Sequence, residues 1–186
     1  MDLELSEVEQ MVQKTARDFA RRVILPQAAA IDREERFPTE ILCGLADLGL
    51  LAVAVPEELG GAGAGPVSYA LAMQEVGYAC ASTAVTMAVH NMVGEVIAHF
   101  GSEAQRRHYC PQLATAFDGT GKFGSFALSE PDAGSDPGAM ATTATKDGDR
   151  YVIRGPKQWI TSARTQACSW CGRVRATGKR SPVRGG

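Results

Sequence analysis

Two stretches of the sequence combine small residues, hydroxyls and an aromatic ring in a way that suits ligand binding. The first, ALSEPDAGSDPG, occupies residues 127–138. We expect a strand that ends at Ser129 and then a turn whose small residues let backbone amides approach a ligand closely. Successive free N–H groups form a concave anion site, and the hydroxyls of Ser129 and Ser135 can donate or accept. The alternative is an ordinary surface turn in which Asp132, Ser135 and Asp136 cap local amides.

The second stretch, GPKQWITSA at residues 155–163, has the alternation expected of a strand. On a strand, Trp159 and Thr161 face the same side, with Ile160 between them. A planar indole beside a hydroxyl suits a flat heteroaromatic ligand, because the indole packs against the ring and the hydroxyl can hydrogen-bond a ring nitrogen. In the alternative interpretation, Trp159 is a core anchor and Thr161 is an ordinary strand residue.

The composition limits the classes of protein to consider. The 186 residues include 45% hydrophobic and 22% charged residues, and the net charge is −2, values that are typical of globular proteins with their own core. No apolar run reaches the ~20 residues of a transmembrane helix. Five cysteines without framework spacing indicate a reducing compartment. The acidic start MDLELSEVEQ has neither a secretory signal nor a transit peptide pattern, so we expect a cytoplasmic protein.

Helices must position the two stretches. Ser6 and Glu9 have the spacing of a capping box, and apolar residues then recur every three or four positions up to Pro26, which should end or kink the helix. The pattern predicts four more helices: one with Ile41, Leu42, Leu45 and Leu48 on one face and a stop at Gly49, one from Pro66 to about Cys80, one over residues 82–100, and one after Gly101 that is bent or broken near Pro111. Five helices without a convincing strand predict an all-α domain.

The glycine-rich stretch LLAVAVPEELGGAGAGP, at residues 50–66, separates the second helix from the third. Its glycines do not fit the dinucleotide-binding pattern G-x-G-x-x-G, and it lacks the Lys-Ser/Thr of a phosphate-binding loop. We interpret it as a mobile connector.

From Lys122 onward the pattern changes to strands. FGSFALSE alternates, and KDGDR between a Thr-rich run and YVI is a hairpin signal. Few strands remain before residue 164, too few to close a sheet. The predicted fold class is α+β: an N-terminal all-α helical bundle domain at residues 1–121, followed by the first strands of an incomplete middle β domain at residues 122–163.

Residues 164–186 form a basic tail with six Lys or Arg and no acidic residue. Cys168 and Cys171 have the C-x-x-C spacing of half a zinc site or of a redox pair, but no second pair or suitable His follows, so we predict no metal. The composition favours a disordered segment over a nucleic-acid-binding one. Earlier in the chain, His90 lies on an apolar helix and is expected to be a buried structural histidine.

The two candidate stretches also carry a family resemblance. ALSEPDAGSDPGA, residues 127–139, resembles position by position the signature of the acyl-CoA dehydrogenase family, and KQWITSA resembles the family's second flavin-contacting strand at the expected separation. DLGLLAVAVPEELGG, ACASTAVTMAVHN and FGSEAQRRHYCPQLATA resemble upstream family segments in the family's order. The resemblance covers residues 1–163 and ends at Arg164, so we interpret the tail as foreign to the family, as a frameshift or a misassembled gene end would produce.

The resemblance implies FAD as cofactor and an acyl-CoA thioester as substrate of an α,β-dehydrogenation. It further implies that electrons leave to an electron-transferring flavoprotein and that the full-length enzyme is a homo-oligomer, with the mitochondrial matrix as an alternative location. Ser129 would bond the pyrimidine edge of the flavin, Thr161 would bond near its N5, and Ser135 would also touch the CoA arm of the substrate. The implied cofactor-binding residues are Phe126, Leu128, Ser129, Gly134, Ser135, Trp159, Ile160 and Thr161.

The resemblance places the catalytic base elsewhere. In most of the family this glutamate lies in a C-terminal four-helix domain, and none of the carboxylates here matches it: Glu130 belongs to the turn, and Glu75 and Glu95 lie on helices. We therefore expect half a flavin site without a base, inactive on its own. Alternatives are a flavin-dependent acyl-CoA oxidase or monooxygenase relative, or a non-catalytic binding fragment. Partners such as nucleic acid or a membrane are not expected.

Overall fold

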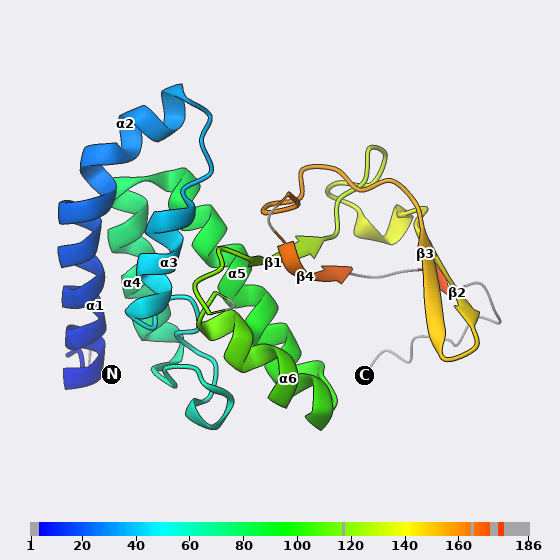
Figure 1. The fold of residues 1–186 in the computed structure, drawn as a ribbon, viewed down its shortest axis with the longest axis horizontal. Helices are drawn as coiled ribbons and strands as arrows, with labels where there is room; N and C mark the ends of the chain where they lie inside the picture. Colours follow the sequence, from blue (N-terminus) through cyan, green and yellow to red (C-terminus); the bar gives the residue numbers. More distant parts are fainter. Residues whose placement is uncertain (1–3, 117, 165, 172–174, 177–186) are drawn as a thin grey trace. The chain divides into compact units, whose positions relative to one another are not determined.

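The structure is a computed structural model that describes residues 4–116, 118–164, 166–171 and 175–176. The chain divides into two compact units (Figure 1). The helical unit comprises residues 1–125 with 162–168, and the β unit comprises residues 126–161 with 169–186.

The first helix of the helical unit is continuous over three segments: α1 (Glu7–Phe19), the π-helical turn η1 (Ala20–Ile24) and α2 (Leu25–Arg33). The predicted capping box is present, since Ser6 Oγ accepts from the Glu9 N–H and the Glu9 carboxylate accepts from the Ser6 N–H at 2.7 Å. Pro26 does not end this helix, contrary to one of the two predicted outcomes. Pro26 lies just after the π turn, across which the Leu25 N–H reaches back to the Ala20 carbonyl.

The remaining helices complete a bundle: α3 (Thr39–Asp47), the short 3₁₀ turn η2 (Glu57–Leu59), α4 (Gly65–Ala79), α5 (Ala81–Phe100) and α6 (Glu103–Ala114). Helix α1 packs against α4, α4 against α5, and α5 against α6. With the first helix counted once, these are the five helices predicted for this part of the chain. Their shared core includes fully buried side chains from η1, α3, α4 and α5 and from the stretch after α3, among them Ile24, Leu42, Leu45, Leu51, Val76 and Met87.

Two details of the helices differ from the sequence pattern. Leu48 does not share the buried face of Ile41, Leu42 and Leu45; it caps the end of α3, and its side chain is 41% exposed. Helix α6 is not broken near Pro111 but continues to Ala114. The proline lies in the last turns of the helix, where a missing N–H bond interrupts little of the backbone ladder.

The glycine-rich stretch is anchored rather than a free connector. Leu50, Leu51, Val53 and Val55 are at most 2% exposed. The buried Asn91 of α5 accepts from the Val53 N–H and donates to the Leu50 carbonyl, both at 3.0 Å. The glycine part then folds back, because the N–H groups of residues 62, 63 and 64 donate to the carbonyls of residues 52, 55 and 53. Asn91 therefore satisfies backbone groups that burial would otherwise leave unpaired.

The strands of the described residues are β1 (Phe123–Ala127), β2 (Thr143–Asp147), β3 (Arg150–Arg154), β4 (Gln166–Cys171) and β5 (Arg175–Ala176), and a 3₁₀ turn η3 (Pro137–Ala139) lies between β1 and β2. Strands β2 and β3 form the predicted antiparallel hairpin, with Asp147 opposite Arg150 and Gly148 at φ 57° in the two-residue turn. One sheet has the order β3-β2-β5 and the other pairs β1 with β4. The α+β fold class predicted from the sequence is confirmed. The rest of the predicted tail, and the cysteine side chains of its C-x-x-C pair, lie outside the described residues.

Among the described residues, no helix combines the length and apolar character needed to cross a bilayer.

Candidate functional site

The turn at residues 127–138 is closed by its own backbone. Strand β1 ends at Ala127, two residues before the predicted end at Ser129. Glu130 and Ala133 then exchange two backbone hydrogen bonds of 3.1 and 3.2 Å. The carboxylate of Asp136 accepts from the Gly138 N–H at 3.0 Å and caps η3. Part of the ordinary-turn interpretation therefore holds, since Asp136 does cap a local amide.

The middle of this turn is open. Gly134 and Ser135 are exposed, and a Cβ added at Gly134 would meet no atom within 4 Å. A ligand can therefore approach the backbone there as closely as the prediction required.

The stretch at residues 155–163 is not a strand, so that prediction is wrong. Trp159 has φ 59°, which lies in the left-handed region where a strand cannot continue. The alternation of Trp159, Ile160 and Thr161 was consistent with a strand, but alternation alone does not report backbone dihedrals. Nor is Trp159 a core anchor, because its side chain is 86% exposed.

The two candidate stretches lie side by side in the β unit. The Gln158 N–H donates to the Ser129 carbonyl at 2.9 Å, and the Lys157 ammonium donates to the Leu128 carbonyl, also at 2.9 Å. These two bonds place the segment before Trp159 directly against the segment that begins the turn. The sequence therefore identified two stretches that the fold brings together.

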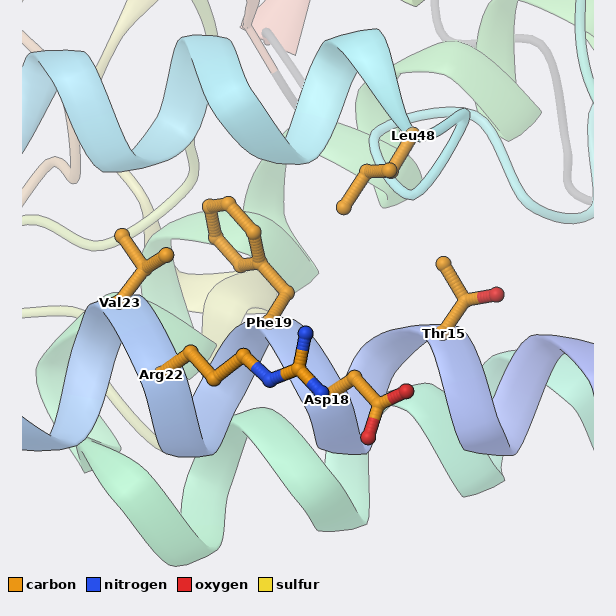
Figure 2. Close-up of a pocket in the computed structure, with 6 residues that line it drawn as sticks. All are labelled: Thr15, Asp18, Phe19, Arg22, Val23 and Leu48. Carbon is orange, nitrogen blue, oxygen red and sulfur yellow. The ribbon is translucent and has the colours of Figure 1, made fainter.

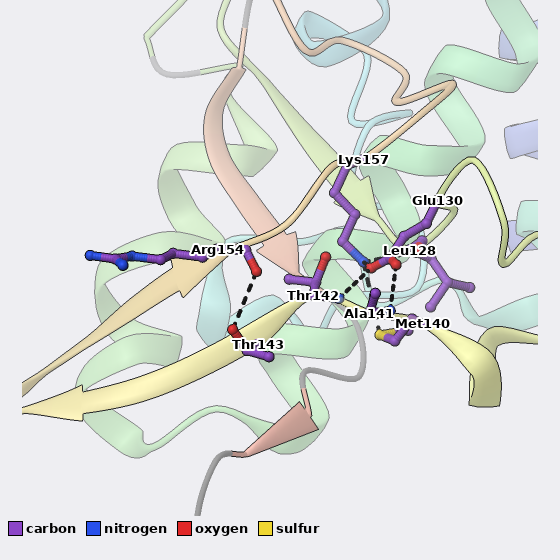
Figure 3. Close-up of polar contacts among 8 residues, drawn as sticks. All are labelled: Leu128, Glu130, Met140, Ala141, Thr142, Thr143, Arg154 and Lys157. Carbon is purple, nitrogen blue, oxygen red and sulfur yellow. Dashed lines mark hydrogen bonds and ion pairs between the residues drawn. The ribbon is translucent and has the colours of Figure 1, made fainter.

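A buried carboxylate joins them, and sequence reasoning missed its role. Glu130, at 5% exposure, accepts from Lys157 Nζ at 2.9 Å and from the N–H groups of Ala141 and Thr142 (Figure 3). Hydrogen bonds from Thr142, Lys157 and Ala141 lower the pKa of Glu130 to about 2, and burial of the carboxylate opposes this lowering. Glu130 is 27 residues from Lys157, so no local spacing could have signalled the pair.

With this geometry established, comparison with known proteins decides the family. The model of the acyl-CoA dehydrogenase N-terminal domain matches residues 6–116, and that of the acyl-CoA dehydrogenase middle domain matches residues 125–183. The chain belongs to the acyl-CoA dehydrogenase family. The match to the middle-domain model extends past Arg164, where the resemblance was expected to end.

Several family members are similar to this chain over most of its length. Mouse short-chain specific acyl-CoA dehydrogenase, named as mitochondrial, is 47% identical over 163 residues, which are 87% of this chain and 38% of the mouse protein. Glutaryl-CoA dehydrogenase of Mycobacterium smegmatis is 31% identical with a TM-score of 0.85, over 93% of this chain and 44% of its own. An acyl-CoA dehydrogenase of Bacillus anthracis complexed with FAD is 33% identical with a TM-score of 0.81, and the match covers 93% of this chain and 29% of the Bacillus chain. The chain thus spans less than half the length of each of these family members.

The residues expected to contact the flavin differ in accessibility. Phe126, Leu128, Ser129, Ile160 and Thr161 are half-buried. Gly134, Ser135 and Trp159 are exposed. The bond of the Lys157 ammonium to the Leu128 carbonyl and that of the Gln158 N–H to the Ser129 carbonyl connect the two segments that carry these residues. The roles of these residues stay predictions.

His90 is buried as expected and connects three elements of the helical unit. The Gly124 N–H at the start of β1 donates to His90 Nδ1 at 3.1 Å, so the proton lies on Nε2, which donates to the Leu113 carbonyl of α6 at 2.8 Å. Burial lowers the pKa of His90 to about 4, opposed by the bond to Leu113. The ring is therefore neutral at physiological pH and serves as a structural bridge. The Phe123 ring packs edge-on against it, with 5.7 Å between the ring centroids.

The helical unit also has a surface hollow of about 310 Å³ beside the π turn. Figure 2 shows Phe19 pointing toward α3 between Val23 and Leu48, while Asp18 and Arg22 line the opposite rim. The apolar part of the hollow belongs to packing, since the Phe19 ring occupies the space that a Cβ at Gly44 would need. It has neither the small-residue turn nor the exposed ring that distinguish the β unit.

Proposed function

We propose that residues 126–161 form part of the FAD site of an acyl-CoA dehydrogenase. The observation that carries the proposal is Trp159: a large aromatic ring, 86% exposed, on a left-handed backbone beside the small-residue turn. Exposing an indole forgoes the free energy of its burial, and a left-handed backbone at a bulky residue is strained. Both features fit a ring that packs against a flat cofactor.

The donor set also fits FAD. Ser129 presents a hydroxyl and Gly134 an accessible backbone, and Ser135 presents a second hydroxyl. Hydroxyls and free amides are donors suited to the pyrimidine edge of the flavin and to phosphate oxygens. We assign Ser129 to the pyrimidine edge, Gly134 and Ser135 to the phosphates or ribityl chain, and Ser135 also to the acyl-CoA. Phe126, Leu128, Trp159 and Ile160 would pack against the ring, and Thr161 would bond near its N5.

The reaction proposed for the whole protein is α,β-dehydrogenation of an acyl-CoA thioester. When bound, FAD supplies the hydride acceptor. The residues of this chain hold and orient the ring, and hydrogen bonds to its pyrimidine edge stabilise the electron-rich form. On the family resemblance we also propose an electron-transferring flavoprotein as electron acceptor and a homo-oligomeric full-length enzyme. The name of the mouse relative supports the mitochondrial matrix over the cytoplasm among the two predicted locations.

We further propose that this chain alone does not dehydrogenate acyl-CoA. Glu130 is held by Lys157 and two backbone N–H groups, so it is not available to remove a proton. Glu75 is paired with Arg17 at 2.7 Å between α4 and α1. Neither of these two carboxylates is available as the base, and we assign the base on the family resemblance to a part of the enzyme that these residues do not supply.

The test is a titration of the purified chain with FAD, monitored by the fluorescence of the flavin and of tryptophan. We expect the wild type to bind FAD and Trp159→Ala to bind it about 5- to 150-fold more weakly, because stacking on an aromatic ring contributes about 1–3 kcal/mol. Tyr151→Ala is the matched control, since Tyr151 is also an exposed aromatic residue, at 64%, but lies on β3. Absence of FAD binding by the wild type overturns the proposed cofactor site. Bleaching of the bound flavin by an acyl-CoA would show that the chain does have a base.

A further inference from the structure

We propose that Glu130 and Lys157 form a positioning latch for the cofactor: the pair fixes the two flavin-contacting segments against each other before FAD binds. This inference rests on the proposed FAD site. It assigns a role to two residues that were not among the predicted contacts.

The latch is built from three hydrogen bonds of the Lys157 ammonium. It donates to Glu130 Oε1 and to the Leu128 carbonyl, both at 2.9 Å, and approaches the Met140 sulfur at 3.9 Å. The side chains of Lys157 and Glu130 are only 14% and 3% exposed. Leu128 is one of the predicted ring contacts, and Lys157 stands two residues before Trp159, so one ammonium group connects the backbone of both segments.

Glu130 extends the latch to a third segment. Its second oxygen accepts from the Ala141 N–H at 2.6 Å, and Oε1 accepts from the Thr142 N–H at 3.1 Å. As Figure 3 shows, the carboxylate and the ammonium meet where residues 128–130, 140–142 and 157 converge. Each oxygen of Glu130 has a donor, so the orientation of the carboxylate is fixed.

Stability alone is a poor explanation for this pair. Burying two charges costs several kcal/mol per ion, and well-packed apolar residues often serve as well. What an ion pair adds is direction, because the ammonium and the carboxylate accept only a few geometries. The directed bond to the Leu128 carbonyl is the one that an apolar pair could not replace.

The test compares Lys157→Met, Glu130→Gln and the double variant with the wild-type chain. Methionine keeps the length of the lysine stem but cannot donate. Because Lys157→Met alone leaves a buried unpaired carboxylate, the double variant serves if that single variant does not fold. Lys146→Met is the matched control, since Lys146 is exposed on β2.

Three readouts decide the proposal. We expect FAD to bind the Lys157→Met and double variants at least about tenfold more weakly, as the loss of charge-assisted hydrogen bonds predicts. At saturating FAD, quenching of flavin fluorescence by Trp159 should be weaker in these variants. In the FAD-free chain, the Gln158 amide should exchange its hydrogen faster, because its bond to Ser129 is no longer held in register. Lys146→Met should match the wild type in all three.

The outcomes separate the latch from the FAD site. If the Lys157→Met or double variant binds FAD as tightly as the wild type, quenches it equally and keeps its Gln158 amide protected, the latch is refuted while the FAD site stands. If the wild type binds no FAD, the proposed function fails, and Gln158 exchange alone decides whether the latch orders the two segments.

Discussion

The interactions within the helical unit differ in kind from those within the β unit. Residues 4–125 enclose a core in which large apolar side chains such as Leu45, Leu51 and Val53 are at most 1% exposed. Between residues 126 and 161 only four residues are buried: Glu130, Ala133, Met140 and Thr142. Glu130 belongs to the Glu130–Lys157 latch. The other three buried residues contact it: Thr142 and Ala133 through hydrogen bonds to Glu130, and Met140 through its contact with the Lys157 ammonium. The first unit is therefore specified by apolar packing, and the second is centred on a polar cluster.

The difference fits the roles proposed for the two units. A packed core resists deformation because its side chains interdigitate. The hairpin β2–β3 has no comparable core, since every residue of β3 is exposed. A unit with little apolar burial needs directed polar bonds to order a ligand site. Perturbing each unit separately tests this contrast.

The largest effect is expected in the helical unit, at Gly61. A Cβ at this position would overlap the backbone carbonyl of Val55, where the glycine-rich stretch folds back on itself. Neither backbone segment can move freely, because Asn91 and the bonds of residues 62–64 hold them. We expect Gly61→Ala to destabilise the unit by about 3–5 kcal/mol, measured by urea unfolding followed by far-UV circular dichroism.

Gly77→Ala is the control for this substitution. Gly77 lies within α4, and its added Cβ would meet Ala84 at an ordinary 3.8 Å. Replacing a helical glycine by alanine stabilises by up to about 1 kcal/mol. Equal unfolding curves for the two variants would show that residues 50–66 are the free connector that their glycine content predicted.

The next effect is an acid sensitivity of the helical unit at His90. Its pKa is about 4 in the folded chain and 6.5 ordinarily. The unfolded chain therefore binds a proton first as the pH falls below 6.5, and stability decreases until about pH 4, by about 3 kcal/mol at most. Urea unfolding at several pH values measures this slope. His90→Gln can make the same two hydrogen bonds without titrating, so its slope should be flatter, whereas exposed His99→Gln should behave as the wild type.

The β unit should respond in a lower pH window. The pKa of Glu130 is lowered from 4.5 to about 2, so its contribution is complete above pH 4.5 and is lost as the pH falls toward 2. Between pH 6.5 and 5 the helical unit should weaken while protection of the Gln158 amide stays constant. Parallel loss in both units over that range would contradict the assignment of separate ionisable centres.

The sequence predicted what depends on local pattern. The Ser6–Glu9 capping box, the five helices and the hairpin turn at Gly148 all follow from residues close together in the chain. It failed where a distant residue decides the outcome: Asn91 anchors a loop 38 residues away, and Lys157 meets Glu130 across 27 residues. The strand predicted for residues 155–163 failed for another reason, because alternation does not determine the left-handed backbone of Trp159.

The smallest effect is expected from a valine-to-alanine substitution, which tests the contrast most directly when it is made in both units. Val53 is 1% exposed in the helical core, and Val152 is 38% exposed on β3. Val53→Ala removes two buried methyl groups and leaves a cavity, so it should cost about 2 kcal/mol. Val152→Ala removes the same atoms from a surface position and should stay within about 0.5 kcal/mol. Urea unfolding reports the first and amide exchange across the hairpin the second. If Val152→Ala unfolded the hairpin, β3 would have to bury more apolar surface than it does here, and the β unit would then depend on apolar packing as the helical unit does.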